Sequence, residues 1–96
     1  MANFIIKKDG TKEPFNPQKI NNAVIAAAIE AGLVAEEVAE IAEEVSSTVD
    51  QSVANLNEVL GVEIMARVLS QLDAIAPIIA NAWRKHDKKN DKKQSK

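Results

Sequence analysis

The stretch that decides the fold is FIIKKDGTKEPFNPQKI, residues 4–20, in which two short extended runs flank an Asp-Gly pair and lead into a helix start. Asp9-Gly10 predicts a β-hairpin with a type I′ turn, because Gly adopts the positive φ of that turn without steric cost. Asn16 followed by Pro17 predicts the start of a helix, since Asn caps free N–H groups and Pro is preset for the first helical position. A β-ribbon therefore feeds directly into a helix N-terminus.

Lysines gather around this junction, at Lys7, Lys8, Lys12 and Lys19. The N-terminus of a helix carries a partial positive charge, and nearby ammonium groups add to its attraction for anions. The residue types and their order therefore predict a phosphate site where the ribbon meets the helix.

Hydrophobic periodicity predicts two helices directly after the ribbon. The first is expected over residues 17–31, with Gly32 as its C-terminal stop. The second is expected over residues 35–52, although Ser46-Ser47-Thr48 weakens it and leaves its end uncertain. Their inward positions are expected to be Ile20, Ala23, Val24, Ala27, Ala28 and Ala31, then Val38, Ile41, Ala42, Val45, Val49 and Val53.

A third helix is predicted after a cap at Asn55 or Asn57, which places Gly61 inside a helix. Gly there costs roughly 1 kcal/mol against Ala, so a close helix approach or a bound group would explain it. The inward positions are expected to be Val59, Leu60, Ile64, Val68 and Leu72.

The fourth helix is predicted to start at Asp73 or Ala76, because Pro77 is tolerated only in a first turn. Its inward positions are expected to be Ile75, Ile78, Ile79, Ala82 and Trp83. The chain then becomes rich in lysine and loses its core residues, which predicts a disordered tail. We expect one domain over residues 1–86 and a tail over residues 87–96.

Charge is distributed unevenly along the chain, whose net charge is −2. Residues 1–20 carry +2 (four lysines, two carboxylates), residues 21–83 carry −9 (one arginine, ten carboxylates) and residues 84–96 carry +5 (seven basic residues, two carboxylates). The acidic middle should repel nucleic acid, whereas either basic end attracts an anion. If the last helix returns to the ribbon, both basic zones serve one site.

The composition argues against catalysis and against a metal site. The chain has no Cys, which excludes disulfides and thiolate chemistry and fits a reducing cytoplasm. The one His, His86, has neither a Cys nor a fixed carboxylate beside it, and the glutamates within residues 36–44 lack a His at ligand spacing. No apolar run reaches the about 18 residues of a membrane span, and no Gly-rich phosphate loop is present. We therefore expect a cytoplasmic protein that is not an enzyme.

Residues 5–20 resemble the opening of the ATP-cone domain, the nucleotide-binding regulatory module of many ribonucleotide reductases and of the transcriptional repressor of their genes. The family opening runs roughly Val-x-Lys-Arg-Asp-Gly-x-x-Glu-x-Phe-Asp/Asn-x-x-Lys-Ile, and here it stands as Ile-Ile-Lys-Lys-Asp-Gly-Thr-Lys-Glu-Pro-Phe-Asn-Pro-Gln-Lys-Ile. Weaker similarity follows in Leu-Gly-Val-Glu-Ile-Met (residues 60–65), Leu-Asp-Ala-Ile-Ala (72–76) and Ala-Asn-Ala-Trp-Arg (80–84). The resemblance spans about residues 4–86.

The resemblance implies an α+β, mostly α fold, in which a short N-terminal β-hairpin packs on a four-helix bundle and ATP or dATP, with or without Mg²⁺, binds between them. It places the phosphates on Lys7 and Lys19 and the ribose or base on Glu13 and Asn16. Lys8 stands where the family often has Arg. The full set of expected nucleotide-binding residues is Lys7, Lys8, Glu13, Asn16, Lys19, Ile20, Val24 and Arg84, with Ile20 and Val24 as an apolar wall for the base and Arg84 as a cation from the last helix.

Some positions depart from the family pattern, among them Gly61 and Met65 where some reductase cones have Thr and His. Without a reductase's zinc ribbon or catalytic barrel, we expect a stand-alone domain that signals nucleotide occupancy to a protein partner, such as a reductase or a related regulator, or through a homo-oligomer. Two alternatives stay open. One is a cone-derived protein–protein interaction module that no longer binds nucleotide. The other is a nucleic-acid accessory protein that uses the basic residues 88–96, although binding of nucleic acid is not expected from the charge of the body.

Overall fold

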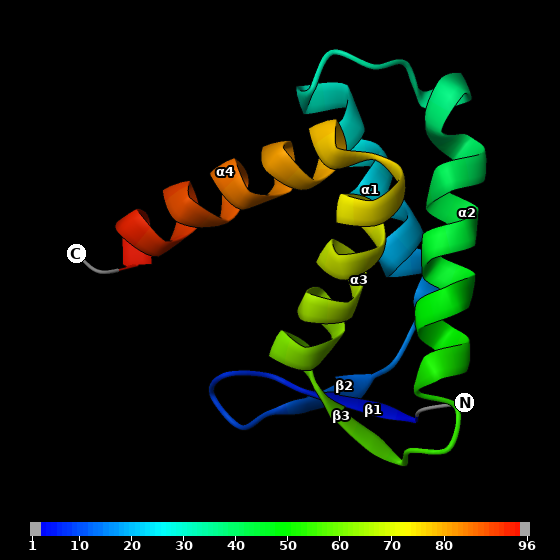
Figure 1. Ribbon diagram of the computed structural model, residues 1–96. Helices are drawn as coiled ribbons and strands as arrows, with labels where there is room; N and C mark the ends of the chain where they lie inside the picture. Colours follow the sequence, from blue (N-terminus) through cyan, green and yellow to red (C-terminus); the bar gives the residue numbers. More distant parts are fainter. Residues whose placement is uncertain (1–2, 95–96) are drawn as a thin grey trace.

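The computed structural model describes the backbone of residues 3–94 and the side chains of residues 3–85. A small three-stranded sheet lies at one end of a set of four helices (Figure 1). This arrangement confirms the predicted α+β, mostly α class. The elements are β1 (Phe4–Ile6), β2 (Lys12–Pro14), α1 (Pro17–Glu30), α2 (Ala35–Ser52), β3 (Glu58–Leu60), α3 (Gly61–Ile75) and α4 (Pro77–Gln94).

The predicted hairpin forms between β1 and β2, but the predicted type I′ turn is wrong. Such a turn needs positive φ at both central residues, and within the described residues only Gly10 and Gly32 have positive φ. The Gly10 N–H donates to the Lys7 carbonyl at 2.9 Å, and the Lys7 N–H donates to the Thr11 carbonyl at 2.8 Å. These bonds define a three-residue loop with Gly10, at φ +88°, in the left-handed bulge position. The Asp9 carboxylate fixes the loop by accepting bonds from the Thr11 N–H and hydroxyl, at 3.0 and 2.6 Å.

The third strand, β3, was not predicted, and the expected helix start at Asn55 or Asn57 is wrong. Residues 58–60 pair in parallel with β1, and Gly61 begins α3 instead of lying inside it. Val59 stands opposite Ile5 and is buried, whereas Leu60 is exposed and not inward as predicted. The pairing partner lies more than fifty residues earlier in the chain, so local periodicity contains no sign of this strand.

The first two helices form as the sequence predicts. The Asn16 side-chain oxygen accepts a bond from the Gln18 N–H at 3.0 Å, and Gly32 follows the end of α1 at φ +92°. In α2, the Ser46 hydroxyl donates to the Glu43 carbonyl at 3.1 Å. This bond satisfies a polar group that is buried against the core, so the helix continues through the serine-rich stretch.

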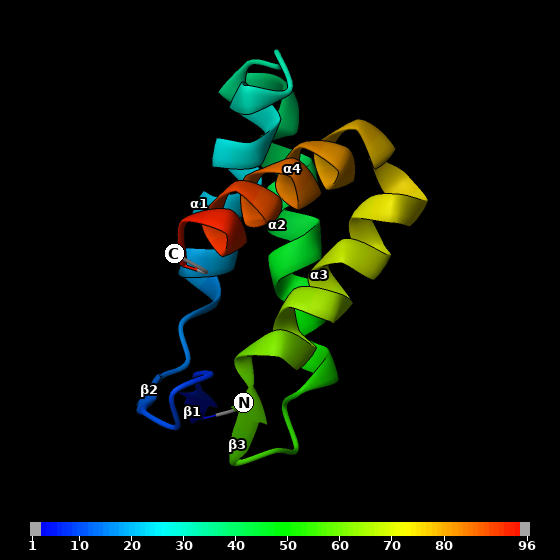
Figure 2. The ribbon, with the colours of Figure 1, turned by 90° about the vertical axis from the view of Figure 1, so that its left-hand side faces the viewer.

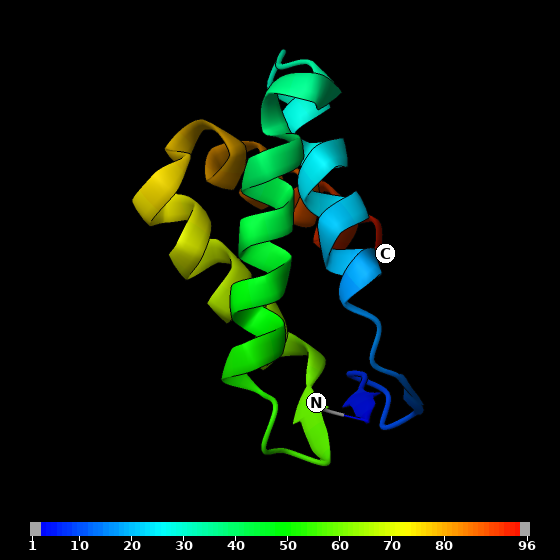
Figure 3. The ribbon, with the colours of Figure 1, turned by 90° about the vertical axis from the view of Figure 1, so that its right-hand side faces the viewer.

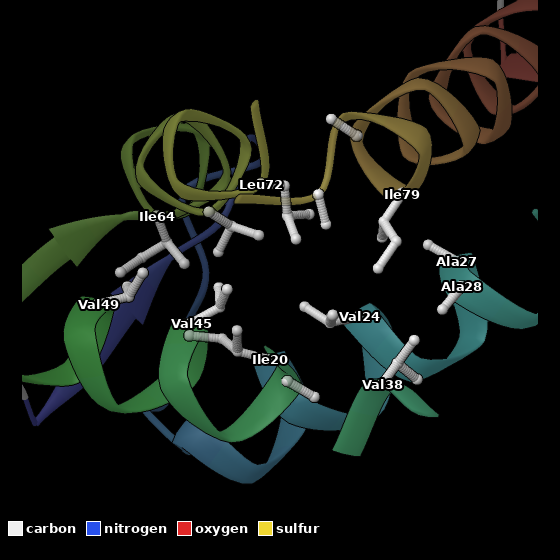
Figure 4. Packing of buried hydrophobic residues seen from close by; sticks show 14 of the residues in the cluster. Ile20, Val24, Ala27, Ala28, Val38, Val45, Val49, Ile64, Leu72 and Ile79 are labelled. Atoms are coloured by element: carbon white, nitrogen blue, oxygen red, sulfur yellow. The ribbon is translucent and has the colours of Figure 1, made fainter. Parts of the chain in front are cut away.

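The core fills the space between the four helices. The main helix contacts join α1 to α2, α2 to α3, α3 to α4 and α4 to α1, so each helix touches two others. Figure 4 shows Val24, Val45, Leu72 and Ile79 pointing into this common interior. Phe15 and Val59 belong to the same buried cluster, and they attach the sheet to the helices; the remaining members include Ile20, Ala27, Ala28, Val38, Ala42, Val49, Val53, Ile64, Val68, Ala76 and Ala80.

The last helix crosses the others (Figure 2), and its far end extends away from them (Figure 1). It begins at Pro77 after a break at Ala76, whose backbone is non-helical at φ −154° and ψ 70°. Because the helix restarts there, Ile79 faces inward as predicted. Ile75 and Ile78 are exposed, so their predicted inward positions are wrong. The helix continues to Gln94, so residues 87–94 are helical where a disordered tail was predicted; residues 95 and 96 lie outside the described residues. A domain boundary at residue 86 stays a prediction.

Candidate functional site

The register of the sheet places two charged residues on the face that meets the helices. Ile5 stands opposite both Glu13 on β2 and Val59 on β3. Side chains that stand opposite one another share a face of a sheet, and Val59 is buried in the core. Glu13 therefore lies on the helix-facing side, and so does Lys7, two residues after Ile5.

One carboxylate and two lysines meet at this place. The Lys7 Nζ lies 3.3 Å from Oε2 of Glu13, and the Lys19 Nζ lies 4.0 Å from its Oε1. Lys7 comes from the end of β1, Glu13 from β2 and Lys19 from the first turn of α1, so three elements contribute one group each. We call these three residues the junction cluster. Its lysine side chains are more than half exposed, whereas that of Glu13 is 32% exposed, so the cluster is open to a ligand from solvent.

The N-terminus of α1 next to this cluster is already capped. Pro17 has no N–H, the Gln18 N–H donates to the Asn16 side chain, and the Lys19 N–H donates to the Asn16 carbonyl at 3.0 Å. The first turn therefore keeps its dipole but offers few free N–H groups. Attraction for an anion here depends mainly on the lysine ammonium groups.

The other predicted residues lie in three different environments: the hairpin loop, the core and an ion pair on α4. Lys8 is exposed in the hairpin loop, next to the junction cluster in sequence. Ile20 and Val24 are 7% and 0% exposed, so they pack in the core and present no open wall to a base in this conformation. The structure thus brings Lys7, Glu13, Asn16 and Lys19 to one junction. The two side chains predicted to contact the base are buried and cannot be reached in this conformation.

Arg84 is held by a different partner. Its guanidinium donates to both carboxylate oxygens of Asp73, at 2.9 and 2.6 Å. These hydrogen bonds lower the pKa of the Asp73 carboxyl and raise that of Arg84. Asp73 lies in the last turn of α3, whose first residue, Gly61, lies against β1. Twelve residues of helix rise about 18 Å. The ion pair therefore lies well away from the sheet end of α3, and Arg84 is not brought to the junction cluster.

Gly61 contacts a strand rather than a second helix. A methyl group at this position would lie 3.5 Å from the Ile6 carbonyl oxygen and 3.6 Å from a side-chain carbon of Ile5, which are ordinary contact distances. The prediction that a close helix approach explains this glycine is therefore wrong. Space alone does not demand glycine here.

Sequence reasoning missed a second polar feature, a cavity between α2 and α3. It has a volume of about 190 Å³ and is lined by Thr48, Val49, Ser52, Arg67, Ser70 and Gln71. One signal was present in the sequence, because Arg67 is the only basic residue among residues 21–83. The spacing of the hydroxyl residues on two helices carried no further sign that they would meet.

The described side chains contain no group of three or more His, Cys, Asp or Glu arranged to hold a metal ion. Within residues 3–94, no helix combines the length and apolar character needed to cross a membrane. The chemistry that the junction cluster offers is electrostatic binding of an anion by two ammonium groups.

Comparison with known proteins identifies a family. The family model described as ATP cone domain matches residues 3–89 of the 96-residue chain. No curated protein matches the sequence. The match covers the sheet, the first three helices and most of α4, and it includes the junction cluster.

Proposed function

Because this chain belongs to the ATP cone domain family, we propose that it binds ATP or dATP at the junction cluster and acts as a non-catalytic regulatory domain. The observation that carries the proposal is the position of the Lys7 and Lys19 ammonium groups, within 3.3 and 4.0 Å of one carboxylate on the helix-facing side of the sheet. A triphosphate is multiply charged, so it attracts both ammonium groups more strongly than a single carboxylate does. Where Mg²⁺ accompanies the nucleotide, the phosphates and water molecules supply most of its ligands.

The proposed site contains Lys7, Lys8, Glu13, Asn16, Lys19, Ile20, Val24 and Arg84. Four of these already share the junction, whereas Arg84 reaches it only if it leaves Asp73 and α4 shifts. The burial of Ile20 and Val24 means that the base reaches them only if α1 moves relative to the sheet. A ligand shifts a conformational equilibrium by its differential affinity for the two states. Binding that requires α1 to move is therefore coupled to the packing of the helices.

This coupling is how we propose that occupancy is signalled. The core residues of α1 contact α2 and α4, so a shift of α1 changes the surfaces that those helices present. A partner protein or a second copy of the chain that prefers one packing would respond to the nucleotide. A ribonucleotide reductase or a related regulator is the class of partner that the family suggests.

The test is the thermal unfolding midpoint with and without ATP, dATP or GTP, each with and without Mg²⁺. At a ligand concentration of 100 times Kd, a specific site adds about 2.7 kcal/mol to the free energy of unfolding. We expect this stabilisation from the adenine nucleotides and expect Lys7→Ala/Lys19→Ala to abolish it. Lys12→Ala/Lys85→Ala is the matched control, because it removes two exposed positive charges outside the proposed site. If both double variants lost the stabilisation equally, the nucleotide would be binding to the overall positive charge and not to a specific site.

The alternative is a cone-derived interaction module that no longer binds nucleotide. The closed state of the apolar wall favours it, since Val24 is fully buried. It predicts that none of the three nucleotides changes the unfolding midpoint of the unmodified protein.

A further inference from the structure

The cavity between α2 and α3 is lined by six residues, five of which carry polar side chains together with their aliphatic parts. Figure 3 shows the two helices side by side, and each contributes three of the six lining residues. Val49 is the one apolar member, and no carboxylate is among them. A cavity of about 190 Å³ holds several water molecules, since each takes about 30 Å³ in the liquid. Its size suits a small ligand, and its polar side chains can hold a polar group of that ligand.

Arg67 gives this cavity its charge. Its Nη2 donates to Oε1 of Glu63, one helical turn earlier, at 3.1 Å. Its Nε is buried and has no acceptor among the described residues. A buried donor without a partner is costly, and the cost is greater for a charged group. The Nε is closed off from the cavity in this conformation, so an acceptor there reaches it once the guanidinium rotates about its terminal torsions. The one hydrogen bond of the guanidinium, from Nη2 to Glu63, leaves that rotation possible.

The hydroxyl groups add further donors. The Ser52 hydroxyl donates to the Val49 carbonyl at 2.8 Å, so its proton is already used. Thr48 and Ser70 make no side-chain hydrogen bond within the described part of the chain, and both line the cavity. The available groups are thus one cationic N–H, two hydroxyl groups and the amide of Gln71, and together they can donate to an anionic oxygen.

We propose that this cavity is a binding site for a small oxyanion, a carboxylate or a phosphate group, held by Arg67 with Ser70 and Thr48. The surrounding charge limits the ligand, because residues 21–83 carry ten carboxylates against this one arginine. A triphosphate would be repelled by that field, so the ligand is singly charged or nearly so. The site shares no residue with the junction cluster and does not depend on the nucleotide proposal.

The side-chain Nε–H signal of Arg67 tests the proposal directly. The chain has two arginines, so an NMR spectrum contains two such signals, and Arg67→Gln assigns one of them by removing it. We expect sodium acetate or sodium phosphate to shift the Arg67 signal saturably, while sodium chloride at the same ionic strength does not. A response to acetate alone assigns a carboxylate, and a response to phosphate alone assigns a phosphate group. No saturable shift with either anion, or the same shift with chloride, overturns the proposal.

Two matched variants separate binding from structural change. Ser70→Ala removes a lining hydroxyl and should weaken the anion about fivefold, the effect of one neutral hydrogen bond. Ser47→Ala removes an exposed hydroxyl from α2 outside the cavity and should leave the affinity unchanged. Equal affinities in these two variants would count against the site. Lys7→Ala/Lys19→Ala should keep the Arg67 response, which distinguishes this cavity from the junction cluster.

Discussion

At the scale of single residues, Glu13 holds the junction cluster together. It is the counter-charge to both Lys7 and Lys19, at 3.3 and 4.0 Å, and it lies on the sheet face that meets the helices. An exposed ion pair contributes little to stability, so its importance here is positional. It keeps two ammonium groups close together, where their mutual repulsion would otherwise separate them.

Glu13→Gln should therefore change affinity for phosphate groups. The carboxylate competes with phosphate for the lysines, so we expect inorganic tripolyphosphate to bind about two- to fivefold more tightly, the range of one exposed ion pair. ATP should gain less, because the proposed contact of Glu13 with the ribose is weakened. Isothermal titration calorimetry with both ligands measures the two changes. Glu58→Gln, which removes the carboxylate paired with Lys12 on the other side of the sheet, is the control and should change neither. Weaker tripolyphosphate binding in Glu13→Gln would contradict the expectation.

Asp73 gives a pH-dependent contribution to stability through its two bonds to Arg84. These bonds lower its pKa in the folded state below the ordinary value of 3.8. A lowered folded pKa stabilises the protein above the unfolded pKa, and that stabilisation is lost as the pH falls through the folded pKa. Asp73→Asn should therefore be less stable than the unmodified protein at neutral pH, and the difference should close below about pH 3.8. Urea unfolding of both proteins as a function of pH measures this difference, and a gap that stays the same at every pH would contradict the expectation.

At the scale of elements, β3 is a three-residue strand that connects the sheet to the helices. It follows α2, pairs with β1 and leads directly into α3, so three residues link the sheet to two helices. Only Val59 of the three is buried. Its side chain therefore carries the packing that holds the strand in place.

Val59→Ala should destabilise the protein by about 2 kcal/mol, because it removes two buried methyl groups at about 0.8 kcal/mol each and leaves a small cavity. Leu60→Ala, on the same strand but 53% exposed, should change the free energy of unfolding by less than about 0.5 kcal/mol. Chemical denaturation gives both values, and hydrogen exchange should show faster opening of β1 in Val59→Ala alone. Equal effects of the two changes would mean that β3 does not pack as described.

At the scale of the whole molecule, the core is one cluster to which every helix contributes. α4 joins it through Ile79 and Ala80, with Trp83 partly buried beside them, and Ala76 just before the helix is also a member. Because α4 closes the ring of helices by contacting both α1 and α3, we expect it to unfold together with the rest.

Ile79→Ala should cost about 2–5 kcal/mol, the range for truncating a fully buried aliphatic side chain. Its neighbour Ile78 is 54% exposed, so Ile78→Ala should cost less than about 0.5 kcal/mol. Trp83 is the only tryptophan and reports on α4, while circular dichroism reports on all the helices. Coincident transitions by the two probes are expected; an earlier fluorescence transition in Ile79→Ala would show that α4 opens independently.

The sequence by itself determined the local structure of the first half of the chain. The Asp-Gly loop, the Asn16 cap, Gly32 and the spacing of valines in α2 act between residues a few positions apart, so these features can be read from their neighbours. The same locality brings Lys7, Glu13 and Lys19 together, since a tight hairpin and an immediate helix start leave the chain little freedom between them.

Only the tertiary structure decided the features that join distant segments. β3 exists because Val59 packs in the core opposite Ile5. Pro77 predicts the helix break at Ala76, but only the way in which α3 and α4 pack on either side of it leaves Ile75 and Ile78 exposed. Arg84 binds Asp73 rather than the junction because the last helix crosses the end of α3, and Arg67 and Thr48 line one cavity from two different helices. Such contacts depend on how the helices and strands pack against one another. That packing depends on the whole chain and cannot be read from a short segment of the sequence.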